Sequence, residues 1–144
     1  MDIIEQLKRI RLLQNKVDAT KEELQSLRDK AYTVQGQAPD DVRIQETKKI
    51  HPLEDLLCKI DLTEKKLDDR SWELVETRHK AINAIFLLQD ANEEDLLCRR
   101  YVWLEKWEDI AKNMGMGVRQ CYKIRNKALK HLEETMAQEA AQSS

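Results

Sequence analysis

The chain has 144 residues, of which 36% are charged and 5% are aromatic, with three glycines and two prolines. That composition is typical of long helices rather than sheets. The 25 lysines and arginines nearly balance the 27 aspartates and glutamates, so the net charge of −2 neither favours nor excludes a nucleic-acid partner.

Several function classes find no support in the sequence. No apolar run approaches the roughly 20 residues that a membrane span needs, and the residues after Met1 do not form a signal-peptide pattern. The three cysteines and three histidines are too widely spaced for a disulfide framework or a metal site. No catalytic triad pattern and no glycine-rich phosphate loop is present. We therefore expect a cytoplasmic, non-enzymatic protein with no cofactor, no metal and no membrane partner.

Residues 3–34 follow a heptad repeat. Eight of the ten seam positions are apolar, which predicts a coiled-coil helix. The two seam columns are Ile3, Ile10, Val17, Leu24 and Ala31, and Gln6, Leu13, Thr20, Leu27 and Val34. Gly36 and Pro39 then oppose continuation of the helix. Residues 40–50 show no clear period, so we predict a loop there.

A second long helix is predicted to begin at Pro52, because proline fits the first helical position. Its apolar positions follow coiled-coil spacings and are Leu53, Leu57, Ile60, Leu67, Leu74, Ala81, Ile85 and Leu88. Two such helices joined by one loop can pack as an antiparallel hairpin or exchange between subunits, and the sequence does not decide between them. We expect the coiled coil to form a homo-oligomer.

A third helix is predicted to begin at Asp90, whose side chain can cap it while Glu93 reaches back to the backbone. It would end at about residue 103 or 105. Its apolar residues would be Leu96, Leu97, Tyr101 and Leu104. We expect Trp103 and Trp107 to fill the small core that this helix shares with the two helices after it.

The next stretch has the pattern of two short helices joined by a glycine turn. Gly115 can adopt the left-handed conformation that ends a helix. The apolar stripes on either side are Ile110, Ala111 and Met114, and Cys121, Ile124, Ala128 and Leu132. A turn of three residues, 115–117, fits the crossing of a helix-turn-helix motif. We therefore predict an all-α protein, in which a long coiled-coil hairpin precedes a three-helix helix-turn-helix domain.

The predicted domains are an oligomerisation region, 1–89, a DNA-binding domain, 90–135, and a disordered tail, 136–144. Charge is unevenly distributed among them. Between Lys112 and His131 there are six basic residues and no acidic one, so the rest of the chain has a net charge of −8. A basic helix on an otherwise acidic protein is typical of a phosphate-binding surface. A solvated helix face with no partner usually alternates acidic with basic residues, and this one does not.

The C-terminal part resembles the fourth region of bacterial sigma factors, and more closely the phage late-gene transcriptional regulators of the ArpU/RinA kind. The residues that carry the resemblance are Leu97, Arg100-Tyr101, Trp107–Ala111, Met114-Gly115, Arg119-Gln120, Tyr122–Ile124 and Ala128-Leu129. Lys106 and Gly117 stand where that family usually has a serine or threonine. The resemblance implies binding to double-stranded DNA upstream of phage late genes and contact with host RNA polymerase.

The same resemblance suggests which residues contact DNA. The candidates for base contacts are Val118, Arg119, Tyr122 and Lys123, with Gln120 pointing more sideways. The candidates for backbone contacts are Arg100, Lys106, Asn126, Lys127 and Lys130. Arg125 lies next to the predicted buried stripe, where it is expected to pair with Glu93 or Glu94.

These observations favour a sequence-specific DNA-binding regulator of phage or prophage genes. Two alternatives stay open. A phage DNA-packaging subunit, similar to a small terminase, also combines a helix-turn-helix with a coiled coil. A coiled-coil scaffold would bind no DNA and would dock its basic helix on an acidic partner.

Overall fold

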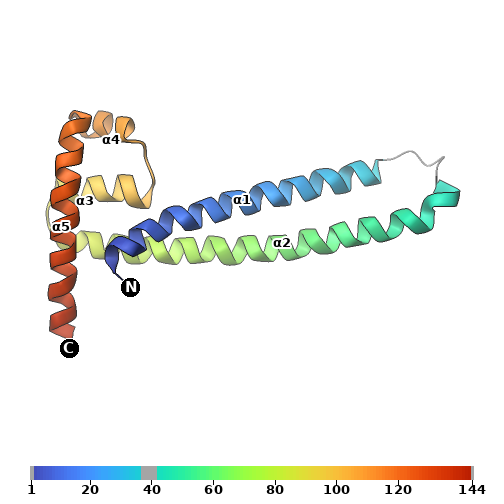
Figure 1. Ribbon diagram of the computed structural model, residues 1–144, viewed down its shortest axis with the longest axis horizontal. Coiled ribbons are helices and arrows are strands. Elements are labelled where there is room, and N and C mark those ends of the chain that lie inside the picture. Colours follow the sequence, from blue (N-terminus) through green and yellow to red (C-terminus); the bar gives the residue numbers. More distant parts are fainter. Residues whose placement is uncertain (1, 37–41, 144) are drawn as a thin grey trace. The chain divides into compact units, whose positions relative to one another are not determined.

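The structure, a computed structural model, describes residues 2–36 and 42–143, those of 42–51 by their backbone only. All regular elements in these residues are helical, as the composition predicts. The long helices are α1 (Ile3–Gln35) and α2 (Val42–Ile85), and the shorter ones are α3 (Ala91–Leu97), α4 (Trp107–Met114) and α5 (Val118–Ser143) (Figure 1). A 3-10 turn η2 (Phe86–Leu88) precedes α3, and a π-helix η3 (Cys98–Val102) follows it.

The described residues fold into two compact units. Unit 1 combines Met1–Leu13 with Glu73–Ser144, and unit 2 is Gln14–Trp72. No described helix is both long and apolar enough to cross a bilayer. The predicted boundary near Asp90 separates proposed roles rather than compact units, and it stays a prediction.

The start of α2 differs from the prediction. Residues 42–50, expected to be a loop, belong to α2, and Pro52 lies inside this helix. The segment 42–51 before Pro52 contains no glycine, and half of its ten residues are arginine, lysine, glutamine or glutamate, which are good helix formers. An internal proline costs about 3 kcal/mol, which the packing of the rest of this 44-residue helix offsets. The other part of the predicted break, residues 37–41, lies outside the described residues.

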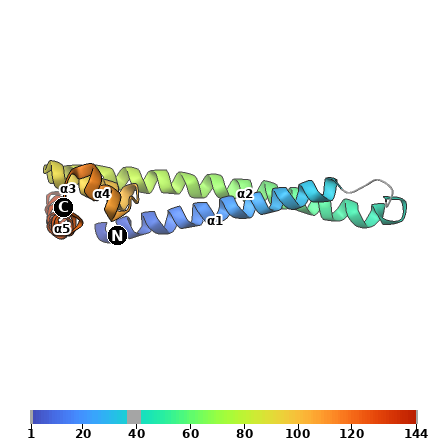
Figure 2. The ribbon, with the colours of Figure 1, turned by 90° about the horizontal axis from the view of Figure 1, so that it is seen from above.

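In unit 2, α1 and α2 pack antiparallel (Figures 1 and 2). Arg28 pairs with Glu64 at 2.9 Å, and Arg70 donates to the hydroxyl of Thr20. Thr20 is 1% exposed, and its hydroxyl also donates to the Lys16 carbonyl at 2.7 Å. Thr20, one of the two polar residues of the predicted seam, is therefore buried with its hydrogen bonds made.

The burial of α1 follows the first column of the predicted seam fully and the second column only in part. All five residues of the first column are buried. In the second column Leu13 and Thr20 are buried, whereas Gln6, Leu27 and Val34 are only half-buried, and the fully buried Leu7 lies next to Gln6. On α2 the predicted seam residue Leu57 is 48% exposed, whereas its neighbour Leu56 is half-buried. A helix turns by about 100° per residue, so two adjacent leucines face different ways and the repeat alone selected the wrong one.

Unit 1 has an aliphatic core, formed where α3 and α4 pack on α5. Its fully buried side chains include Leu7, Ile10, Ile85, Leu96, Leu97, Val102, Ile110, Cys121 and Leu132. The prediction that Trp103 belongs to this core is wrong, because Trp103 is 56% exposed. Trp103 directly follows η3, and the centroid of its ring lies 5.1 Å from the Arg78 guanidinium. Trp107 is half-buried at the edge of the core.

The N-terminus of α3 is capped, but not by the predicted pair of acids. Asp90 Oδ1 accepts from the Glu93 backbone N–H at 3.1 Å, as expected. The return contact comes from Glu94, whose Oε1 accepts from the Gln89 N–H at 3.0 Å. Glu93 cannot reach back because it is buried and bound to His131.

The third helix continues through η3 to Val102, close to the predicted end at about residue 103. Leu104, predicted to belong to this helix, lies beyond it in the left-handed conformation, with φ 59. Helix α5 includes residues 136–143, which the sequence assigned to a disordered tail. That stretch consists mostly of alanine, glutamine, glutamate and methionine, with no glycine or proline to end the helix.

Candidate nucleic-acid interface

A turn built from backbone hydrogen bonds joins α4 to α5. Gly115 has φ 67 and ψ 37, the left-handed conformation that the sequence predicts. Its N–H donates to the Lys112 carbonyl at 3.3 Å, and the Met116 N–H donates to the Ala111 carbonyl at 3.0 Å. This pair of bonds is the Schellman motif, which satisfies the last carbonyls of a helix. The turn is therefore fixed by the backbone, with glycine at the position that needs a positive φ.

One face of α5 packs into the core of unit 1. Cys121, Ala128 and Leu132 are each 0% exposed, and α5 contacts α3, α4 and η2. From α4, Ile110 and Ala111 are buried too. The two predicted apolar stripes thus anchor α5 along one side.

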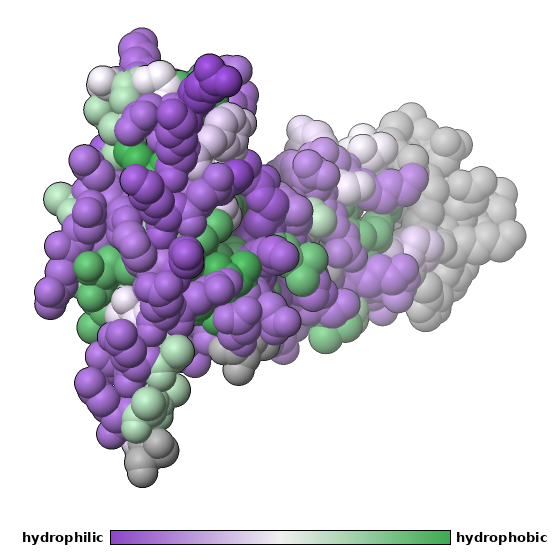
Figure 3. Space-filling model, turned by 60° about the vertical axis from the view of Figure 1, so that its left-hand side comes forward, coloured by the Kyte–Doolittle hydropathy of each residue, from purple (hydrophilic) through white to green (hydrophobic). Residues whose placement is uncertain are grey.

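The opposite face of α5 is exposed and basic. Arg119, Lys123 and Lys130 lie about 160–200° around the helix axis from Cys121, at 100° per residue. All three are exposed, as is Lys127 beside them. We call these four residues the basic stripe. Hydrophilic residues dominate the face of α4 and α5 that is visible in Figure 3. Because α5 contains no acidic residue between Val118 and Leu132, no acidic side chain interrupts the basic stripe.

Two arginines stack on two aromatic rings beside the start of α5. The rings of Trp107 and Tyr122 lie 4.7 Å apart at an interplanar angle of 49°. The Arg100 guanidinium is 4.8 Å from the Trp107 ring, and that of Arg125 is 5.5 Å from Trp107 and 5.0 Å from Tyr122. Each such contact contributes about 0.5–1 kcal/mol when exposed and about 2 kcal/mol when desolvated. This arginine–aromatic cluster, which the sequence analysis missed, connects η3, α4 and α5.

The predicted contact residues divide into two groups by exposure. The exposed group is Lys106, Arg119, Gln120, Tyr122, Lys123, Asn126, Lys127 and Lys130. All of these lie on α5 except Lys106, which directly precedes α4. Val118 and Arg100 are half-buried. Arg100 lies in η3, apart from the basic stripe, and its Nη1 donates to the Glu105 carbonyl at 2.9 Å.

The predicted pairing of Arg125 with Glu93 or Glu94 is wrong. Arg125 donates to Asn126 Oδ1 at 3.1 and 3.2 Å and stacks on the rings near α4. The carboxylate of Glu93, 9% exposed, instead lies 2.7 Å from Nδ1 of His131. The reason is the position of the two residues around the axis of α5, which directs Arg125 toward α4 and His131 toward α3.

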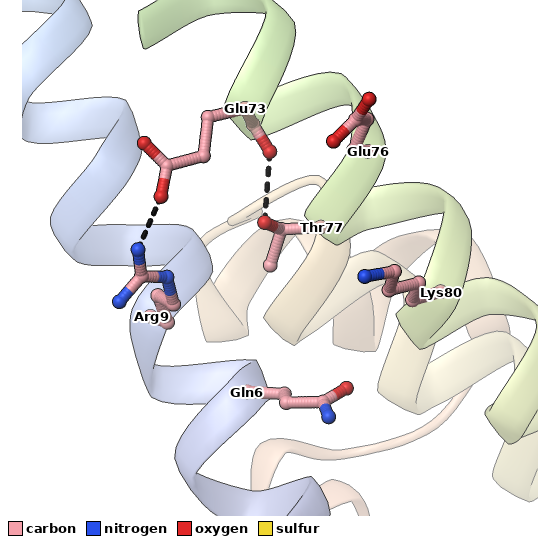
Figure 4. Close-up of a pocket in the computed structure, with 6 residues that line it drawn as sticks. All are labelled: Gln6, Arg9, Glu73, Glu76, Thr77 and Lys80. Atoms are coloured by element: carbon pink, nitrogen blue, oxygen red, sulfur yellow. Dashed lines mark hydrogen bonds and ion pairs between the residues drawn. The ribbon is translucent and has the colours of Figure 1, made fainter. Parts of the chain in front are cut away.

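A polar groove of about 380 Å³ lies elsewhere in unit 1, between α1 and α2 (Figure 4). Arg9 forms an ion pair with Glu73 there, and the Thr77 hydroxyl donates to the Glu73 carbonyl at 2.8 Å. The other lining residues are Gln6, Glu76 and Lys80. Charges of both signs balance in this groove, so it has no strong preference for an anion or a cation. In the described ranges no group of three histidine, cysteine or acidic residues is placed to hold a metal ion.

The chain has no significant match among models of protein families, among curated proteins or among solved structures. Its function has therefore to be inferred from its own residues.

Proposed function

We propose that this protein is a non-enzymatic, sequence-specific DNA-binding regulator, in which α4, the glycine turn and α5 act as a helix-turn-helix. The observation that carries this proposal is the basic stripe, exposed on one face of α5 while the opposite face is anchored in the core. An α-helix with its side chains is about 10–12 Å across. That width fits the major groove of B-DNA, which is about 12 Å wide.

The two ends of α5 would then have different roles. Its first two turns would enter the groove and contact base edges through Val118, Arg119, Gln120, Tyr122 and Lys123. Arginine and lysine can donate two hydrogen bonds to guanine, and an apolar side chain can pack on the thymine methyl group. The residues that would contact the phosphate backbone are Asn126, Lys127 and Lys130, together with Lys106 before α4. Backbone contacts fix the position of the protein without reading sequence.

The long helices would supply pairing between subunits. We propose that α1 and α2 form a coiled-coil hairpin that brings copies of the chain together, because one small module makes few contacts with DNA. A dimer could place two recognition helices on half-sites about 34–36 Å apart. The resemblance to phage late-gene regulators suggests that the targets are phage or prophage genes and that host RNA polymerase is a partner.

Selection of duplexes from a random pool by the full-length protein tests the proposal. With heparin present as a competitor, we expect one motif to be enriched and to bind about a thousandfold or more tightly than unrelated duplexes. A matched pair of variants then locates the interface. Lys123→Ala removes a charge from the basic stripe, whereas Lys66→Ala removes an exposed lysine from α2. Only Lys123→Ala should weaken binding.

The alternatives give different results in the same experiments. A scaffold whose basic helix docks on an acidic protein would enrich no motif, and that outcome would refute the proposal. A packaging subunit would bind DNA without altering transcription. Transcription in vitro from a promoter that contains the enriched motif, with and without the protein, separates a regulator from a packaging subunit.

A further inference from the structure

Unit 1 contains a small pocket between the first turns of α1 and the segment that follows α3. Its volume is about 110 Å³, whereas one water needs only about 10–15 Å³ of such space. The lining residues are Leu7, Lys8, Arg11, Arg100, Tyr101 and Leu104. Three of the six carry a positive charge and none is acidic, so we call this the basic pocket.

Neighbouring carboxylates do not neutralise the cations of the basic pocket. Elsewhere on α1, Arg9 and Arg28 each pair with a glutamate. Within the described part of the chain, no ion pair involves Lys8 or Arg11. Burial lowers the pKa of the Arg100 guanidinium, and the positive charges of Arg11 and Arg125 lower it further. Like charges gathered in this way repel one another, and a bound anion would remove that repulsion.

The backbone around the basic pocket is held in an uncommon conformation. Arg100 and Tyr101 lie in the π-helix η3, and Leu104 has φ 59, which residues other than glycine seldom adopt. The bond from Arg100 to the Glu105 carbonyl fixes the guanidinium but uses few of its five N–H donors. Single π-turns and strained backbone occur often at binding sites, where they position side chains in advance.

We propose that the basic pocket binds a phosphoryl group, and that in the DNA complex this group is a backbone phosphate next to the bases contacted by α5. The planar arginine fork matches two phosphate oxygens, and lysine adds a compact charge. The pocket lies beside the recognition helix, because Arg100 stacks on Trp107 and Trp107 stacks on Tyr122 of α5. The DNA assignment rests on the proposed function, and it adds the first turns of α1 to the interface.

A double variant of the full-length protein, Lys8→Gln with Arg11→Gln, tests this site on the selected duplex. Both residues would contact one phosphate, so the log–log salt slope should fall by about 1 rather than 2. Affinity at low salt should fall about tenfold, with base preference unchanged. The matched control is Lys16→Gln with Lys21→Gln, two exposed lysines of α1. If both double variants show the same salt slope, the DNA assignment is overturned.

Replacing single phosphates of the duplex by neutral methylphosphonates identifies the phosphate concerned. At one position the replacement should weaken binding of the wild type about tenfold and leave the Lys8/Arg11 variant unaffected, because that variant has already lost the contact. If every position affects the two proteins equally, the basic pocket contacts no backbone phosphate and the DNA assignment fails.

Inorganic phosphate distinguishes failure of the pocket from failure of the proposed function. Titration of phosphate at constant ionic strength, followed by NMR of the arginine side chains, should shift the Arg100 signal in the wild type but not in the Lys8/Arg11 variant. If the wild type binds no DNA yet shows this shift, the proposed function fails and the basic pocket stands as a site for free phosphate. If phosphate and chloride act alike, the pocket is not a phosphoryl site.

Discussion

Arg119 and Lys130 lie on the same exposed face of α5, yet we expect them to contribute differently to DNA binding. They are separated by eleven residues, or about 16 Å along the helix axis at 1.5 Å per residue. The major groove is only about 12 Å wide. When the first turn of α5 contacts bases, Lys130 must therefore lie at or beyond the edge of the groove, where the phosphates are.

The two substitutions should accordingly have different signatures. Arg119→Ala should cost about 1–3 kcal/mol on the preferred site and flatten the preference at one or two base pairs, because a bidentate contact discriminates its base. Lys130→Ala should weaken binding to all sequences alike and lower the log–log salt slope by about 1, because one neutralised phosphate is lost. Fluorescence anisotropy with base-substituted duplexes and with a salt series measures both effects.

The reverse pattern would refute the proposed orientation of α5. If Arg119→Ala weakened every sequence equally while Lys130→Ala changed the preferred site, the other end of α5 would contact the bases. The division of α5 into reading and positioning residues would then be wrong, even though the basic stripe itself would still bind DNA.

Three further predictions concern stability and reactivity. Gly115→Ala should lower the free energy of unfolding by about 1 kcal/mol, because a side chain is strained at φ 67. Gly117→Ala, the control, should change it little, because Gly117 has open space around it and no positive φ. Equal urea melts of the two variants would contradict this prediction. Burial and two acidic neighbours raise the pKa of the Cys98 thiol to about 11. At pH 8 only about one Cys98 in a thousand is then a thiolate, which is the reactive form. A maleimide should therefore label the exposed Cys58 before Cys98. The raised pKa stabilises the fold below the ordinary value of 9.0, and this contribution should disappear as the pH rises to about 11. The double substitution Ile10→Asp with Leu24→Asp should put two charges into the buried seam and lower the free energy of unfolding by several kcal/mol. Circular dichroism should show lower helicity, and the sedimentation profile should change. An unchanged thermal melt would show that the seam is not packed.

The parts of the fold that a single residue type determines could be predicted from the sequence. Gly115 ends α4 because a positive φ favours glycine, and Asp90 caps α3 because a carboxylate can accept from the backbone N–H three residues later. The buried face of α5 followed from apolar spacing, and the exposure of the basic stripe followed from the same spacing. Where two neighbours were chemically alike, as with Leu56 and Leu57, periodicity could not choose between them.

Features that depend on several elements meeting could not be predicted. The arginine–aromatic cluster requires η3, α4 and α5 to converge, and nothing in the local sequence of Trp107 indicates that its ring lies between two guanidiniums. The basic pocket brings residues 8 and 11 next to residues 100 and 101. The partner of Glu93 proved to be His131 rather than Arg125, because the choice depends on the rotation of α5 about its axis.

The contact between the buried Thr20 and the half-buried Arg70 favours one lengthwise alignment of α1 and α2. A slide of one heptad, about 10.5 Å, would replace Thr20 by Leu13 or Leu27 of the same seam column. The Arg70 guanidinium would then face an alkyl chain and lose a hydrogen bond, and such a bond contributes about 0.5–1.5 kcal/mol net. The apolar seam alone tolerates such a slide, because most seam positions are apolar at that spacing. The Thr20 hydroxyl therefore distinguishes one alignment of two otherwise repetitive apolar surfaces. It would favour the same alignment if the two helices came from different subunits.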